Sequence, residues 1–223
     1  MHPKKSLFFV VLLLLVVVTV VFVGSTVWRN EKMNETSTLR PVEIREYEGQ
    51  KLSSIDDFRE NSIKGPQFVN NETYRLVVTG LVNNEIGYTY GDVISNYQLF
   101  EKVVTLRCVE GWEVTILWEG VLVRDLIEEA GVDSRAKVVV FYAYDGYSTS
   151  LPLDYIINND ILIAYKMNSV VLPPERGFPF QLVAESKYGY KWIKWITEIE
   201  LSDDVDYRGY WESRGFPNDA DLP

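Results

Sequence analysis

Short segments rich in β-branched and aromatic residues, separated by glycine and proline, dominate the chain from residue 74 to residue 201. Segments of this kind are typical of β-strands, and about seven of them occur here. They span residues 74–82, 103–108, 114–118, 137–144, 161–167, 180–185 and 190–201. The pattern therefore predicts a β-rich fold built around one sizeable core.

Helical patterns are short and few. Residues 122–130 place Leu122, Leu126, Ile127 and Ala130 on one helical face, and Gly131 follows as a natural C-terminal stop. Shorter helices are expected at residues 89–98, with Thr89 as the N-cap, and at residues 153–159. Few helices among many strands indicate the α+β class with mixed strand pairing.

The N-terminal region carries an apolar run at residues 7–23, interrupted only by Thr19. Extended to Trp28, it gives a helix of roughly 33 Å, which is long enough to cross a bilayer. Lys4 and Lys5 precede the run, so the N-terminus is expected in the cytoplasm and the rest of the chain outside the cell membrane. A cleaved signal peptide is the alternative, but residues 23–25 form a poor cleavage site. The sequence favours a single-pass anchor.

Four regions are expected along the chain. Residues 1–28 form the cytoplasmic end and the transmembrane anchor, residues 29–65 a polar linker, residues 66–213 the folded domain, and residues 214–223 a tail. The stretch from residue 202 is acidic but contains Tyr207, Tyr210, Trp211 and Phe216, so part of it is expected to pack on the domain. After residue 28 the chain carries 20 basic and 32 acidic residues, which makes nucleic acid an unsuitable partner.

Several classes of site are excluded by residues that the chain lacks. Its one histidine, His2, precedes the apolar run, which removes histidine-dependent triads and ordinary zinc sites from the folded domain. A single cysteine rules out Cys-x-x-Cys motifs and c-type haem attachment. No glycine pattern for binding nucleotide phosphates is present either.

Two features remain that could carry chemistry. Cys108 is the one cysteine, and it follows Arg107 at the predicted end of a strand. It is either a buried thiol that fills space or a reactive thiolate. A second segment, residues 187–194, holds three lysines in eight residues, which suits an anion but also suits a solvated face. Taken separately, each feature favours the structural interpretation.

Taken together, the two segments resemble the oxidoreductase molybdopterin-binding domain shared by sulfite oxidases and the catalytic subunit of periplasmic methionine-sulfoxide reductase. The resemblance covers about residues 65–213. Its motifs are RCVEGW at 107–112 with Trp118-x-Gly120, DGY at 145–147 leading to LPL at 151–153, Asn159-Asp160 before Ala164, Gly177-x-Pro179, and KYGYKWIK at 187–194.

The resemblance implies a role for each matching residue. Cys108 would be the protein thiolate on molybdenum or tungsten, beside the dithiolene sulfurs of the pterin, with positive charge supplied by Arg107 or the lysines. Tyr147 would donate a hydrogen bond to substrate. The pterin and its phosphate would be held by Lys187, Tyr188, Gly189, Lys191, Trp192, Ile193 and Lys194. Lys191 and Lys194 cannot share a face of an ideal strand, so irregular backbone is expected there.

Position 181 departs from the pattern, because Gln181 stands where sulfite and sulfoxide enzymes often have arginine. The departure weakens the case for an anionic substrate such as sulfite. Arg176 is the nearest residue that would replace the missing charge. The asparagine-rich cofactor contacts usual at the N-terminal side have no clear counterpart in the sequence.

The function implied by the resemblance is a membrane-anchored, extracytoplasmic, molybdopterin-dependent oxidoreductase. It would transfer an oxygen atom to or from a small sulfoxide-like or sulfite-like substrate, with molybdenum cycling between its hexavalent and tetravalent states. Its electrons would pass through a membrane cytochrome or a quinone-linked subunit. Two alternatives stay open: a β-rich cell-surface binding module that has the same fold without the cofactor, and a thiol-redox protein, which would lack a resolving cysteine.

Overall fold

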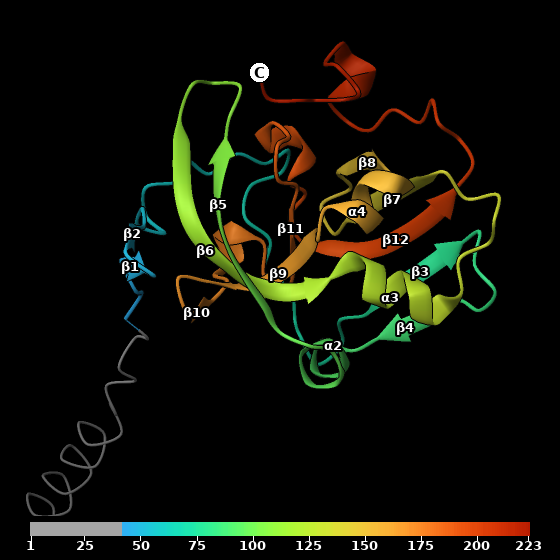
Figure 1. Ribbon diagram of the computed structural model, residues 1–223, viewed down its shortest axis with the longest axis horizontal. Helices are drawn as coiled ribbons and strands as arrows, with labels where there is room; N and C mark the ends of the chain where they lie inside the picture. Colours follow the sequence, from blue (N-terminus) through green and yellow to red (C-terminus); the bar gives the residue numbers. More distant parts are fainter. Residues whose placement is uncertain (1–41) are drawn as a thin grey trace, which may run out of the picture. The chain divides into compact units, whose positions relative to one another are not determined.

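The computed structural model describes residues 42–223, and the predicted anchor at residues 7–28 lies outside them. Residues Glu43–Pro223 form one compact unit. Two five-stranded sheets make up most of this unit (Figure 1), which confirms the β-rich fold with mixed pairing. Between residues 42 and 223, no helix has the length and apolar character needed to cross a membrane.

The first sheet has the strand order β10-β9-β6-β5, and β11 also pairs with β9. Every pair in it is antiparallel. Its strands are β5 (Phe100–Arg107), β6 (Glu113–Leu122), β9 (Leu162–Met167), β10 (Val170–Val171) and β11 (Gln181–Val183). At Gly120 a Cβ atom would lie 2.1 Å from the carbonyl oxygen of Ile163, so only glycine permits this close approach of β6 to β9.

The second sheet has the order β4-β3-β12-β7-β8. Strand β12 runs parallel to β3 and antiparallel to β7, so this sheet is mixed. Its strands are β3 (Leu76–Gly80), β4 (Ile86–Tyr88), β7 (Val138–Ala143), β8 (Ser148–Pro152) and β12 (Ile196–Ser202). All residues of β7 except Tyr142 are buried, as the continuous apolar run predicted.

Between residues 42 and 223, three short α-helices connect the strands: α2 (Tyr90–Asn96), α3 (Val123–Ala130) and α4 (Leu153–Asn158). A capping box starts α2, since Thr89 accepts from the backbone of Asp92 and the Asp92 carboxylate accepts from the backbone of Thr89. Helix α3 ends at Gly131, which has a φ of 74°. Both ends were predicted from the sequence.

The last predicted strand starts later than expected. Residues 190–201 were predicted as a strand, but β12 begins at Ile196, and the preceding residues form the 3-10 turn η2 (Gly189–Lys191) and a bend. Trp195 has a φ of 55°, which a strand does not allow. The irregular backbone expected between Lys191 and Lys194 is therefore confirmed. Strands β4 and β8, which were not predicted, form the two edges of the second sheet.

The structure also differs from the expected linker at residues 29–65. From Glu43 onward this segment belongs to the compact unit, and it contains the small hairpin β1 (Glu46–Tyr47) and β2 (Gln50–Lys51). The ring of Phe58 packs edge-on against Trp118 at 6.1 Å. At the other end, Ala220 is buried and its carbonyl accepts from the backbone N–H of Tyr188 at 2.8 Å, which confirms that the C-terminal segment packs on the domain.

Candidate active site around Cys108

A cavity of about 520 Å³ lies beside the turn between β5 and β6. Figure 1 shows the tip of this hairpin at the end of the domain opposite α2. The wall brings together residues from distant parts of the chain: the segment around Asn61, the turn at Cys108, Tyr147 after β7, Gln181 of β11, and Lys194. The volume is within the range of small-molecule and cofactor sites.

Cys108 is the residue directly after β5, and a tight turn fixes its backbone. Its N–H donates to the carbonyl of Trp112 at 2.9 Å, and its carbonyl accepts from the N–H of Gly111 at 3.0 Å. Gly111 has a φ of 85°, which glycine adopts readily. The sequence Cys-Val-Glu-Gly-Trp thus forms a closed turn that holds the half-buried thiol on the cavity wall.

The surroundings of Cys108 do not favour a free thiolate. Burial raises the pKa of the thiol, and Glu110 adds to that shift, while backbone N–H groups and Arg59 oppose it. The side-chain amide of Asn61 lies 3.7 Å from Sγ. Arg107 points elsewhere, since its Nε donates to Glu113 at 2.9 Å and both side chains are exposed. The positive charge expected from Arg107 is therefore directed away from the thiol.

The second predicted segment meets Cys108 at Gly189. A Cβ atom on Gly189 would lie 3.4 Å from the carbonyl oxygen of Arg107 and 3.7 Å from Cα of Cys108, so the two backbones are nearly in contact. Tyr188 forms an isolated parallel bridge with Arg107. Behind them the buried rings of Trp118 and Trp192 pack at 5.6 Å. The motifs that suggested the family are therefore adjacent in the fold.

Lys194, which the resemblance assigned to the cofactor, lies on the cavity wall. Its Nζ donates to the Glu60 carboxylate at 2.7 Å and to the carbonyl of Glu175 at 3.2 Å. It also lies 4.4 Å from the centre of the Trp195 ring. Burial lowers the pKa of Lys194, and Glu60 partly restores it. Trp192 and Ile193 line the cavity too, but their N–H groups already donate within the turn, to Gly189 and Lys191.

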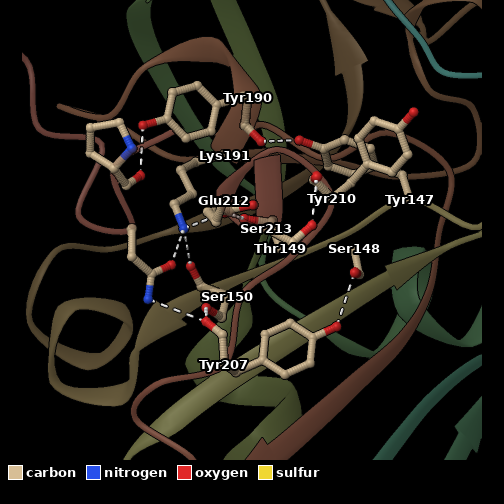
Figure 2. Close-up of polar contacts among 12 residues, drawn as sticks. Tyr147, Ser148, Thr149, Ser150, Tyr190, Lys191, Tyr207, Tyr210, Glu212 and Ser213 are labelled. Carbon is tan, nitrogen blue, oxygen red and sulfur yellow. Dashed lines mark hydrogen bonds and ion pairs between the residues drawn. The ribbon is translucent and has the colours of Figure 1, made fainter. Parts of the chain in front are cut away.

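Lys191 faces the opposite way and is fully buried outside the cavity lining. Its Nζ donates to Glu212 at 2.6 Å, to the carbonyl of Ser150 at 2.9 Å and to Asn218 at 3.2 Å (Figure 2). Thr149 donates to the same Glu212 oxygen at 2.6 Å. All three protons of the ammonium group are used, so Lys191 holds the C-terminal segment and does not face a ligand.

Lys187 is likewise directed away from the cavity. It is buried, it pairs with the carboxylate of Asp221, and its Nζ lies 4.8 Å from the centre of the Tyr155 ring. Neither Lys187 nor Tyr188 lines the cavity. Of the three lysines expected at the cofactor, the structure brings only Lys194 to the site.

Tyr147 reaches the cavity through the Asp145-Gly146 turn. Its N–H donates to Asp145 at 2.9 Å, and its hydroxyl donates to the carbonyl of Tyr190 at 2.6 Å (Figure 2). Burial raises the pKa of the Tyr147 hydroxyl, and the nearby carboxylates of Glu212 and Asp145 add to the shift. The hydroxyl proton is thus used in the hydrogen bond to Tyr190. Tyr147 therefore contributes mainly its aromatic ring to the cavity lining.

Gln181 and Arg176 lie on the same wall, close to Gly177. Gln181 is only 3% exposed and lines the cavity, whereas the buried side-chain oxygen without a hydrogen-bond partner among residues 42–223 is Oε2 of Glu212, outside the lining. Arg176 donates to the carbonyls of Ile55 and Phe58, both at 3.2 Å, and its guanidinium lies 4.9 Å from the centre of the Phe58 ring. The Arg176 side chain therefore points inward, and its hydrogen bonds hold residues 55–58 against the domain.

The segment from Phe58 to Ile63 is the part of the site that the sequence did not reveal. All six of its residues line the cavity, and Asn61 reaches the thiol of Cys108. The sequence gives little sign of this, because the segment is polar and non-periodic apart from Phe58 and Ile63.

The cavity residues suit a molybdopterin group. Cys108 offers a soft sulfur donor, which is the type of ligand that such a metal takes. Gln181 adds an amide to the cavity lining, where its polar atoms would meet a bound group. Lys194 and Asn61 supply further donors on the same wall. The residues that would hold the group are therefore Cys108, Asn61, Gln181 and Lys194.

Comparisons with known proteins identify the family. A family model described as oxidoreductase molybdopterin binding domain matches residues 63–211. The chain is 33% identical over 152 residues to the uncharacterized oxidoreductase YuiH of Bacillus subtilis, covering 68% of this chain and 76% of YuiH. It is 30% identical to the protein-methionine-sulfoxide reductase catalytic subunit MsrP of Pseudomonas syringae pv. tomato, covering 64% of this chain and 47% of MsrP.

A solved structure shares the fold. The sulfane dehydrogenase SoxCD from Paracoccus pantotrophus superposes with a TM-score of 0.61 at 22% identity, over 65% of this chain and 42% of that one. The chain belongs to the oxidoreductase molybdopterin-binding domain family. It is an enzyme of the molybdopterin-dependent oxidoreductase class, in the sulfite oxidase group, as the sequence motifs predicted.

Proposed function

We propose that this chain binds molybdopterin in the cavity beside Cys108 and transfers an oxygen atom to or from a small substrate. The observation that carries the proposal is the convergence of the family's thiol with Asn61, Gln181 and Lys194 on one wall. When bound, the group supplies the two-electron oxygen-atom chemistry. The protein supplies one sulfur ligand, polar contacts and a shaped cavity.

The raised pKa of Cys108 has a consequence for cofactor loading. A thiol must lose its proton to become a metal ligand, and burial makes that loss unfavourable in the unloaded protein. Cys108 would give up its proton when it becomes the sulfur ligand, and that proton would leave the site. Cys108 would therefore remain a protonated thiol until the cofactor binds, and Arg107 would not lower its pKa beforehand.

The balanced reaction requires an external redox partner. Reduction of an oxo compound consumes two electrons and two protons and yields the deoxygenated compound and water; the reverse direction releases them. The described residues contain no second redox centre of their own. MsrP is named as a catalytic subunit, which supports the proposal that this chain also works with an electron-transfer subunit, a membrane cytochrome or a quinone-linked protein.

Membrane anchoring through residues 7–28, with the domain outside the cytoplasm, is part of the same proposal. It rests on the apolar run and on Lys4 and Lys5. Protease added to intact cells should degrade the domain, and the protein should remain with the membrane fraction after a carbonate wash. Recovery of the domain intact and inside the cells would contradict this orientation.

The direct test is the metal and pterin content of purified protein. Wild-type protein made in a host that produces the cofactor should contain one molybdenum or tungsten and one pterin per chain. Gln181→Ala and Lys194→Met should fold but retain less cofactor, whereas Glu128→Gln on α3, outside the cavity lining, should match the wild type. Folded wild-type protein without metal would overturn the proposal in favour of a cofactor-free binding module.

A further inference from the structure

One surface turn, just before β3, carries a motif that has no part in the oxidoreductase site. Residues 71–73 are Asn-Glu-Thr. An asparagine followed two positions later by serine or threonine is the acceptor pattern for N-linked glycosylation, provided that proline does not stand between them. The same tripeptide occurs at residues 34–36, outside the described residues. Since the pattern is common in sequences, its surroundings in the fold decide whether a copy can be modified.

The turn presents this motif to solvent. Asn71, Glu72 and Thr73 are all exposed. Asn70 closes the turn, because its side-chain oxygen accepts the N–H of Glu72 at 2.9 Å and its carbonyl accepts the N–H of Tyr74 at 3.0 Å. Tyr74 is buried, and its hydroxyl donates to a carbonyl of β12. The acceptor side chain of Asn71 is therefore accessible on a turn that the core holds in place.

An exposed aromatic ring lies next to the motif in the chain. Phe68, three residues before Asn71, is 76% exposed and is the most exposed aromatic side chain between residues 42 and 223. Every other phenylalanine in that range is buried or half-buried. The adjacent Val69 packs against the hydrophobic core, whereas the ring of Phe68 stays in solvent. The folded chain thus leaves the apolar area of this ring uncovered.

A sugar on Asn71 would supply the missing cover. Three residues span at most about 10–11 Å of chain, so the ring of Phe68 is within reach of a sugar attached to the Asn71 amide. One face of a hexose ring carries mainly C–H groups, and such a face packs well on the face of an aromatic ring. The exposed ring and the acceptor asparagine therefore suit the same ligand, a glycan.

We propose that Asn71 is an N-glycosylation site and that the first sugar of its glycan packs on the ring of Phe68. The inference rests on that part of the proposed function which places the domain outside the cytoplasm. The donor is a lipid-linked oligosaccharide. The side-chain nitrogen of Asn71 bonds to the anomeric carbon of the donor, the bond between that carbon and the lipid phosphate breaks, and the nitrogen loses one proton as the lipid phosphate leaves. No electrons are exchanged.

A glycan at this position would not touch the active site. No residue between 64 and 105 lines the cavity beside Cys108. Removal of the glycan should therefore leave the metal and pterin content of the protein unchanged. This separates the modification from the oxidoreductase chemistry, so each can be tested without the other.

Peptide mass spectrometry of the full-length protein, purified from the membranes of the cells that make it naturally, tests the site. The peptide that contains residues 71–73 should be heavier by the mass of a glycan, and fragmentation should place that mass on Asn71. Asn70 is an internal control in the same peptide, because Glu72 stands two positions after it. Asn71→Gln and Thr73→Ala should remove the added mass, whereas Thr73→Ser should keep it.

A second measurement tests the contact with the ring. Phe68→Ala should lower the melting temperature of the glycosylated protein by about 2–4 °C, the shift expected for the loss of one aromatic contact in a domain of this size. In the Asn71→Gln background, the same change should have no effect. Val205→Ala, at another exposed apolar side chain, should have no effect in either background. Equal losses from Phe68→Ala in both backgrounds would contradict the contact.

The outcomes distinguish this inference from the proposed function. An unmodified Asn71 in a domain that added protease shows to lie outside the cytoplasm would overturn the inference and leave the proposed function standing. A domain inside the cytoplasm would overturn the proposed orientation and this inference together. Folded protein without metal, but with a glycan on Asn71, would overturn the proposed cofactor chemistry alone.

Discussion

Lys191 and Lys194 lie three residues apart in one segment, yet the fold gives them different tasks. Lys191 is sealed in the interior, where its three protons bind Glu212, Ser150 and Asn218. Lys194 lies on the cavity wall, where its pair with Glu60 remains partly accessible. The 3-10 turn η2 and the bend after it produce this separation. A lysine-rich motif therefore combines a structural residue with a site residue.

The largest loss of stability should follow from breaking the buried ion pair between Lys191 and Glu212. Lys191→Met leaves Glu212 buried without its counter-charge, and the loss of one member of a buried ion pair costs about 3–5 kcal/mol of unfolding free energy. Denaturant titration of the purified protein measures it. The double variant Lys191→Met/Glu212→Leu should recover much of the loss, because neither charge then remains buried. A loss under about 1 kcal/mol in the single variant would contradict the structural role.

The cavity lysine should behave differently. Lys194→Met removes hydrogen bonds to Glu60 and to the carbonyl of Glu175, but Glu60 can turn to water, so the stability loss should be about 1–2 kcal/mol. Cofactor content should nevertheless fall, which metal analysis would detect. If stability fell as far as in Lys191→Met while metal content stayed normal, the contrast between the two lysines would be wrong.

The thiol offers a test by pH. Because burial raises the pKa of Cys108, iodoacetamide should alkylate the cofactor-free protein more slowly at neutral pH than it alkylates the unfolded chain. The alkylation rate should rise with pH and reach half its maximum at a pH above the ordinary pKa of a cysteine thiol. The single cysteine makes the modified mass unambiguous. A midpoint below that of the unfolded chain would indicate an activated thiolate, and metal-loaded protein should be protected.

The smallest effect is expected at Arg107. Its pair with Glu113 is exposed, and such pairs contribute about 0–1 kcal/mol. Arg107→Ala should therefore match Glu113→Ala in stability, and both should keep the metal content of the wild type. Loss of metal in Arg107→Ala alone would show that this arginine does act on the thiol.

The sequence predicted the part of the site that depends on local motifs. Cys108, Tyr147, Gln181 and Lys194 were named from the motifs that carry the family resemblance, Gln181 as a departure from them, and the fold places all four on one cavity. The helix ends at Thr89 and Gly131 were also predictable, because capping depends on neighbouring residues.

The parts that could not be predicted depend on distant contacts. Lys191 turns inward because of Glu212, 21 residues further along, and no local pattern encodes that pairing. Asn61 reaches Cys108 across 47 residues from a segment without hydrophobic periodicity. The polar composition of this segment resembles that of a linker, and its docking depends on Phe58 and on the backbone bonds from Arg176.

The central claim is that Cys108 is the protein's ligand to the metal. X-ray absorption at the molybdenum edge of the purified holoprotein, compared with Cys108→Ser, tests it most directly. The wild type should show one more sulfur neighbour at the metal than the variant, with the pterin content of both recorded on the same samples. Identical sulfur coordination in the two metal-loaded proteins would contradict the account.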